Sequence, residues 1–235
     1  MRTTKSISRI IGILLLVQLA GFIVPFVILQ PIIMAGFLTS AAVNAFQIKT
    51  AVFLLFWNCA VTIAISIAGW PIFRQYSEAA SLLLVAVSVM MFVLQAVDNI
   101  QLLSMLSLSQ QYTQAGGQEE LFQTLAAAIR STRKWAHYSE LLMIDAWICV
   151  FYSLLYRSVL VPRAVALLGL TTITLHFTGM TMPLFLGYRG VAVMAMSIIL
   201  SHLTLAVWLV CKGFDDSSLL PGVKAHSPAI SQSFS

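Results

Sequence analysis

The chain has 235 residues, of which 60% are hydrophobic and only 9% are charged, with a formal net charge of +5. A soluble domain carries roughly a quarter charged residues, so this composition excludes an ordinary soluble protein. The 13 lysines and arginines do not gather in one segment, as a nucleic-acid-binding surface would require, so we expect no nucleic-acid partner.

Apolar segments recur along the chain at the length that a helix needs to cross a bilayer, about 20 residues. They show no alternation of period two, so we expect helices rather than a β-barrel. The predicted fold class is an all-α integral membrane protein, a bundle of six transmembrane helices. The expected spans are residues 10–29, 51–70, 79–108, 135–156, 164–186 and 191–211.

The distribution of positive charge predicts that both termini are cytoplasmic (N-in/C-in), because lysine and arginine accumulate on the inner side of a membrane. With the N-terminus inside, eight basic residues fall on the inner side: Arg2, Lys5, Arg9, Arg74, Arg157, Arg163, Lys212 and Lys224. Five fall on the outer side: Lys49, Arg130, Arg133, Lys134 and Arg189. We expect a cytoplasmic N-terminus (1–9), a transmembrane domain (10–212) and a disordered cytoplasmic tail (213–235).

The connections contain two segments that we expect to lie in the outer membrane interface. Residues 30–50 contain Pro31 and mixed apolar side chains, which indicates a short helix. The longest expected loop, 109–134, begins with the polar stretch SQQYTQAGGQEE. After it, apolar residues return at helical spacing and predict an amphipathic helix; they are Leu121, Phe122, Leu125 and Ile129.

Ionisable residues inside the spans are the candidate functional residues, because such groups are costly in a bilayer unless they are paired or hydrated. Four of them come from four different spans and fall about 15–20 Å from a membrane edge at 1.5 Å per residue. We expect them to form a polar cluster near the midplane: Asp98, Asp145, His176 and His202. His137 and Glu140 share a helix face with Asp145 and are expected at the outer entrance of that cluster.

The cluster leaves three hypotheses open. The residues could relay protons or link proton entry to solute movement, which predicts a proton-linked transport or permeation pathway. They could instead pair with one another and fix the packing of a structural or regulatory protein that has no chemistry of its own. Their ligand types also suit a membrane metalloprotein, with His176 and His202 as axial haem ligands in one variant.

No motif favours an enzyme or a particular cofactor. The sequence has no nucleotide-binding loop and no GxSxG, HExxH or CxxC motif. The three cysteines lie inside spans and are expected to be packing residues. We therefore predict no catalytic residue and no cofactor, and any metal-binding or cofactor-binding residues stay open. The expected partner is the lipid bilayer, and a homo-oligomer or a membrane-protein partner stays open.

Four stretches resemble one bacterial membrane protein family: FLTSAAVNAFQIKTAVF, WPIFRQYSEAASL, LLYRSVLVPRAVALLGL and VWLVCKGF. It is the six-span family catalogued as domain of unknown function 4386, and the resemblance covers residues 8–214. The third stretch is the most specific of the four. The resemblance implies six spans and a place in the bacterial inner membrane. It implies no activity, and no functional residue is carried over, since Ser88 and Met91 stand where the family commonly has an arginine and a glutamate.

Overall fold

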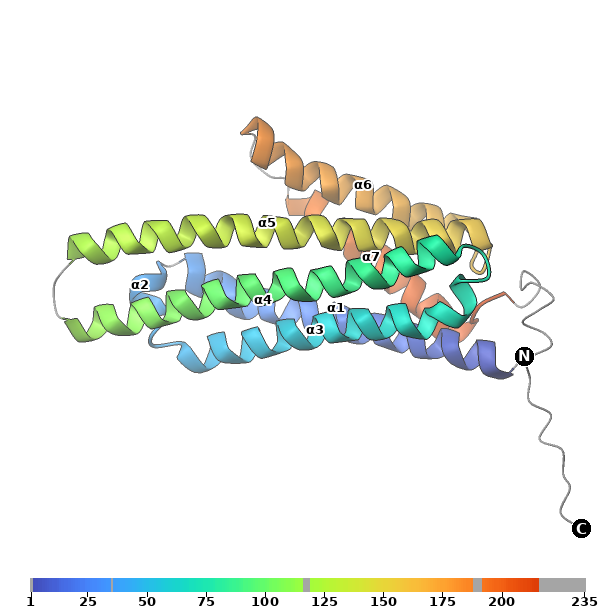
Figure 1. The fold of residues 1–235 in the computed structure, drawn as a ribbon, viewed down its shortest axis with the longest axis horizontal. Helices are drawn as coiled ribbons and strands as arrows, with labels where there is room; N and C mark the ends of the chain where they lie inside the picture. The colour runs from blue at the N-terminus through green and yellow to red at the C-terminus, as the bar shows by residue number, and fades with distance from the viewer. Residues whose placement is uncertain (1, 35, 116–118, 188–191, 216–235) are drawn as a thin grey trace, which may run out of the picture.

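The computed structural model describes residues 2–34, 36–115, 119–187 and 192–215, and every regular element in them is a helix (Figure 1). The elements in chain order are α1 (Arg2–Met34), α2 (Phe37–Ser40), α3 (Ala45–Phe73), α4 (Glu78–Ala115), α5 (Glu119–Ser158), α6 (Arg163–Leu186) and α7 (Ala192–Cys211). The all-helical prediction is confirmed for this part of the chain.

The long helices pack as a closed ring. Each contacts the next in the order α1, α3, α4, α5, α6, α7, and α7 contacts α1 again. The short helix α2 packs against α4 near one end of the bundle. In Figure 1, α6 runs beside α5 at its first turns and diverges from the bundle toward its C-terminal end. A ring of this kind encloses an interior to which every long helix can contribute side chains.

Both ends of the described chain lie at the same end of the bundle. The backbone N–H of Asp215 donates to the carbonyl of Leu160 in the turn between α5 and α6, at 2.9 Å. A side chain at Gly213, just after α7, would contact Ser8 in the first turns of α1. The loop of α2 and the far ends of α4 and α5 lie at the opposite end (Figure 1).

The chain is a multi-pass helical membrane protein. Within the described residues, five helices are long and apolar enough to cross a bilayer, namely α1, α3, α4, α5 and α6. The apolar stretch of α7, Met196–Cys211, is shorter. Large apolar side chains such as Val27, Phe53 and Ile100 are exposed on the outside of the bundle, a surface that lipid covers in a membrane.

Several expected helix boundaries differ from the observed ones. Helix α1 continues through Pro25 and Pro31 to Met34, beyond the expected end at residue 29. Helix α4 has 38 residues and α5 has 40, so each is about 57–60 Å long at 1.5 Å per residue, roughly twice the hydrocarbon core. Their far ends therefore extend beyond a bilayer as an antiparallel hairpin.

The segment expected as a separate amphipathic helix is the first part of α5. Phe122 and Ala126 are buried, and the ring of Phe122 packs edge-on against Tyr112 of α4 at 5.5 Å between centroids. Leu121 and Leu125, by contrast, are exposed. The buried stripe therefore faces α4, and this helix-to-helix contact makes α5 continuous into the span. The expected disordered tail lies outside the described residues from residue 216 onward.

Candidate functional site

A cavity of about 290 Å³ lies inside the ring, and all six long helices line it. The wall contributed by α1 is largely apolar, with Leu19, Phe22, Phe26 and Leu29. The remaining wall carries most of the polar and ionisable groups: Asn58, Thr62, Gln95, Asp98, Arg133, His137, Glu140, His176 and His202. The sequence predicted a cluster and its entrance from six residues in all. Five of these six residues line this one cavity, and the sixth, Asp145, contacts His176.

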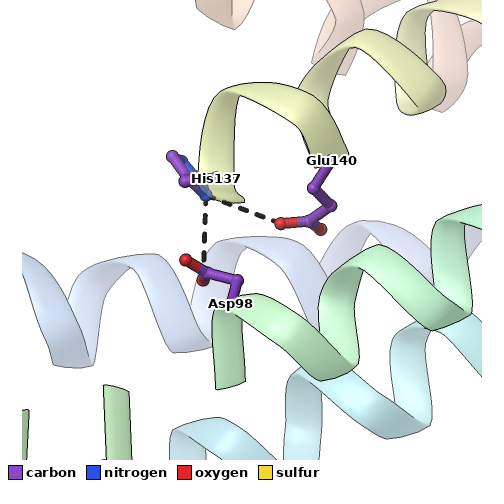
Figure 2. A group of neighbouring side chains, drawn as sticks. All are labelled: Asp98, His137 and Glu140. Carbon is purple, nitrogen blue, oxygen red and sulfur yellow. Dashed lines mark ion pairs between the residues drawn. The ribbon is translucent and has the colours of Figure 1, made fainter. Parts of the chain in front are cut away.

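Three ionisable side chains meet at one place in the cavity wall (Figure 2). Asp98 comes from α4, and His137 and Glu140 come from α5 one turn apart. His137 Nδ1 lies 3.8 Å from Asp98 Oδ2 and 3.5 Å from Glu140 Oε2. Arg133, one turn before His137, places its Nε 3.5 Å from the other carboxylate oxygen of Asp98.

The two carboxylates of this cluster are deeply buried. Asp98 is 1% exposed and Glu140 is 5% exposed. A carboxylate taken out of water costs several kcal/mol unless a positive charge or hydrogen bonds compensate it. Arg133 supplies a permanent positive charge on α5, so the α4–α5 contact compensates the buried negative charges electrostatically. This explains how two acids are tolerated in a chain that is otherwise so apolar.

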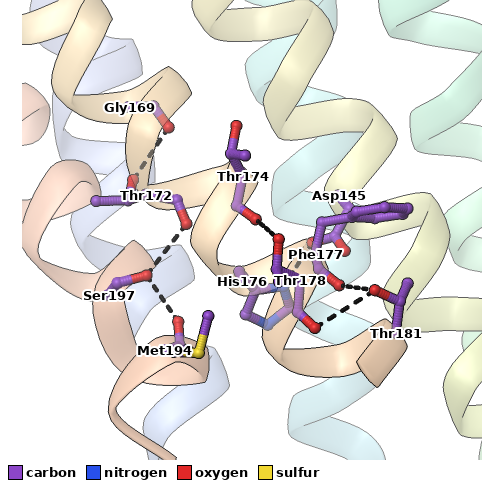
Figure 3. Close-up of polar contacts among 10 residues, drawn as sticks. All are labelled: Asp145, Gly169, Thr172, Thr174, His176, Phe177, Thr178, Thr181, Met194 and Ser197. Atoms are coloured by element: carbon purple, nitrogen blue, oxygen red, sulfur yellow. Dashed lines mark hydrogen bonds and ion pairs between the residues drawn. The ribbon is translucent and has the colours of Figure 1, made fainter. Parts of the chain in front are cut away.

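A second polar pair lies between α5 and α6. His176 Nδ1 is 2.6 Å from Asp145 Oδ1, a strong hydrogen bond between two buried side chains (Figure 3). The second oxygen of this carboxylate, Oδ2, is buried without a hydrogen-bond partner. When Nδ1 carries the proton, the other ring nitrogen of His176 is left as an acceptor. The pair therefore holds a proton beside the wall of the cavity.

Hydroxyl groups join α6 to α7 near this pair. Thr172 Oγ1 donates to Ser201 Oγ at 2.8 Å. Ser197 Oγ donates to the backbone carbonyl of Thr172 at 3.1 Å, as Figure 3 shows. Two half-buried threonines of α6, Thr178 and Thr181, instead donate to carbonyls one turn back in their own helix. Of these hydroxyl contacts, only Thr172 with Ser201 and Ser197 with Thr172 join two helices.

His202 occupies a third position in the cavity wall. Its ring packs edge-on against Tyr152 with 5.6 Å between centroids, and its Nδ1 lies 3.3 Å from the carbonyl of Ile198 in the preceding turn. Both rings are buried. Among the described residues, no ion pair or hydrogen bond joins His202 to His176 or to Asp98.

The structure thus divides the expected midplane cluster. Asp145 and His176 are in direct contact, and Asp98 lies with the two residues expected at the outer entrance. His202 lines the same cavity as His176, but in the described chain it makes no hydrogen bond or ion pair with His176 or Asp145. In the described chain, the one group of histidine, cysteine and acidic residues able to hold a metal ion is Asp98, His137 and Glu140. The residues considered as metal ligands from the sequence were Asp98, Asp145, His176 and His202, so the two sets share only Asp98.

Arg133 is the site residue that the sequence analysis missed, because it was assigned to the loop before residue 135. The pattern that reveals it is the spacing of Arg133, His137 and Glu140, which places all three on one face of a helix. Ile144 and Trp147 continue the same stripe and also line the cavity.

Comparison with known proteins identifies the chain only at the level of its family. No curated protein and no solved structure matches the chain. The family model described as "Domain of unknown function (DUF4386)" matches residues 10–213, which include every helix that lines the cavity. The resemblance seen in the sequence is confirmed, and the chain belongs to this family.

Proposed function

We propose that the chain is a six-span protein of a bacterial inner membrane, with both termini in the cytoplasm. In support, α7 completes the ring between α6 and α1 and would supply the sixth span beside the five long apolar helices. Both ends of the described chain lie at the same end of the bundle, as an even number of crossings requires. The excess of basic residues near that end favours a cytoplasmic location for it.

We further propose that this protein moves a small solute through its cavity in a proton-linked manner. The observation that carries this proposal is that His176 lines the cavity while its ring is hydrogen-bonded to the buried carboxylate of Asp145. Gain or loss of one proton changes the charge of this pair by one unit. In a medium of low dielectric constant, that change alters the free energy of any charged solute in the cavity.

The test is proton uptake into proteoliposomes that contain a trapped pH-sensitive dye. Protein-containing vesicles are exposed to an inward proton gradient, with and without a panel of small cations and zwitterions such as choline, glycine and Zn²⁺. We expect at least one solute to accelerate proton movement in the unchanged protein. Asp145→Asn and His176→Gln should abolish this response, because neither replacement can carry the transferable proton.

Glu120→Gln is the matched control for this experiment. It removes a carboxylate from an exposed position on the same helix as Asp145 and should leave the response unchanged. A rate equal to that of protein-free vesicles for every solute would contradict the transport proposal. So would a response that survives in both Asp145→Asn and His176→Gln.

A structural role is the second candidate, and the same contacts support it. The Asp145–His176 bond joins α5 to α6, and the Thr172–Ser201 bond joins α6 to α7. These bonds could hold α6 in the ring without any transport. In that case Asp145→Asn and Thr172→Val should both lower the yield and melting temperature of the folded protein. Under the transport proposal, Asp145→Asn instead gives a folded protein that has lost its response.

A further inference from the structure

We propose that Asp98, His137 and Glu140 form a binding site for a divalent transition-metal ion of the Zn²⁺ class. One ligand atom from each residue lies within 4.8 Å of the others. The set offers one imidazole nitrogen and two carboxylate oxygens, which are ligand types that Zn²⁺, Fe²⁺ and Mn²⁺ accept. This inference does not rest on the proposed transport, because it needs only the α4–α5 contact.

The spacing of the ligand atoms carries the proposal. His137 Nδ1 is 3.8 Å from Asp98 Oδ2 and 3.5 Å from Glu140 Oε2. Both distances are too long for a hydrogen bond, which has a usual length of about 2.7–3.2 Å. Ligands about 2.1 Å from a tetrahedral metal lie about 3.4 Å from one another. The spacing of the three side chains therefore matches that of ligands around a common centre.

Unsatisfied polar atoms provide a second observation. His137 Nδ1 and the second carboxylate oxygen of Asp98, Oδ1, are buried atoms that lack a hydrogen-bond partner, and the charged group nearest to Oδ1, Arg133 Nε, is 3.5 Å away. Asp98 lines the cavity and is almost fully buried, so bulk water does not satisfy that oxygen. A bound cation with a coordinated water would satisfy both atoms. Figure 2 shows the three side chains converging from α4 and α5.

Access and charge also suit a divalent cation. The side chain of His137 is 45% exposed, whereas those of Asp98 and Glu140 are buried, so an ion can enter at the histidine. The cavity leaves room for water as a fourth ligand. With neutral histidine, the two carboxylates and Arg133 sum to a charge of −1, which attracts a cation. Arg133 limits the affinity because it repels that same cation.

The experiment measures Zn²⁺ binding to full-length, metal-stripped protein in detergent by equilibrium dialysis. Co²⁺ then serves as a probe, because its visible spectrum reports the number of ligands. We expect one Zn²⁺ per chain. His137→Ala and Glu140→Gln should each weaken binding by more than about tenfold, because each removes a ligand. Glu120→Gln removes an exposed carboxylate from the same helix and should bind as the unchanged protein does.

Two further variants separate a metal site from a merely structural cluster. His137→Cys supplies a thiolate, a good zinc ligand, and should retain the binding that His137→Ala loses and shift the Co²⁺ spectrum. Arg133→Gln should tighten Zn²⁺ binding severalfold, because it removes the repelling charge. No stoichiometric Zn²⁺ in the unchanged protein, or equal binding by His137→Ala, would overturn the proposal. The Asp145→Asn protein should bind Zn²⁺ normally. The Zn²⁺ measurement can therefore be interpreted even if the transport proposal fails.

Discussion

At the scale of single residues, Arg133 determines how the buried carboxylate of Asp98 is tolerated. The two side chains approach to 3.5 Å, and Asp98 is far more deeply buried than the arginine. A buried ion pair contributes little to the free energy of unfolding compared with apolar side chains of similar volume at the same place. Removal of one partner is nevertheless costly, because the other charge is left uncompensated in a medium of low dielectric constant. The ion pair therefore holds α4 and α5 at a fixed register without adding much net stability.

This energetic asymmetry predicts a non-additive pair of substitutions. Asp98→Asn in the metal-free protein should lower the free energy of unfolding by roughly 3 kcal/mol, because it leaves Arg133 without its counter-charge. Arg133→Gln should be destabilising for the converse reason. The double variant should lose clearly less than the sum of the two single losses. Denaturant titration followed by circular dichroism measures all three, and simple additivity would show that the two charges do not interact.

At the scale of helices, the packing of α6 on α5 depends on the lack of a side chain at Gly169. The ring of Tyr152 lies where a methyl group on Gly169 would be, and Tyr152 is fully buried. The approach is close enough for Asp145 and His176, farther along the same two helices, to form their 2.6 Å bond. A small residue at a helix contact thus positions the polar pair about two turns away.

Gly169→Ala should therefore destabilise the protein by about 1–3 kcal/mol, because the added methyl forces the helices apart. The loss should be smaller in the background Tyr152→Ala, where the ring is absent. Leu167→Ala, at an exposed position two residues earlier on α6, serves as the control and should change the melting temperature little. Thermal melting in detergent measures each variant. An unchanged melting temperature for Gly169→Ala would mean that α6 is not packed on α5 as described.

The helices themselves could be predicted from the sequence, but some of their ends could not. Hydropathy located all six long helices, because apolar length is a strong local pattern. It placed the start of α5 at residue 135 instead of Glu119, because the first turns of that helix are rich in charge. Those turns are stabilised by contact with α4 through Phe122, and such a tertiary contact is not visible in a hydropathy profile.

At the scale of the whole molecule, the candidate site too could be predicted only in part, because its contacts are tertiary. Depth along each helix was enough to select Asp98, Asp145, His176 and His202 as interior residues, and all four are buried. Depth could not tell which of them would meet, because that depends on the rotation and order of helices around the ring. Asp98 faces α5, so its partners are His137 and Arg133 rather than the residues of α6 and α7.

The order of helices also yields a test of orientation. In the proposed arrangement, the turn before Glu78 faces the cytoplasm, and the hairpin end that carries Thr124 extends outside the membrane. Both residues are exposed, so a cysteine at either position is open to a maleimide reagent that cannot cross the membrane.

Thr124→Cys should react in intact cells, whereas Glu78→Cys should react only after the membrane is permeabilised. Both variants are made in a background with Cys149→Ser and Cys211→Ser, because these two cysteines are exposed, whereas Cys59 is buried. The reverse pattern would invert the orientation and place the exposed side of His137 toward the cytoplasm. Labelling of both variants in intact cells would mean that α4, which separates the two positions, does not cross the membrane as proposed.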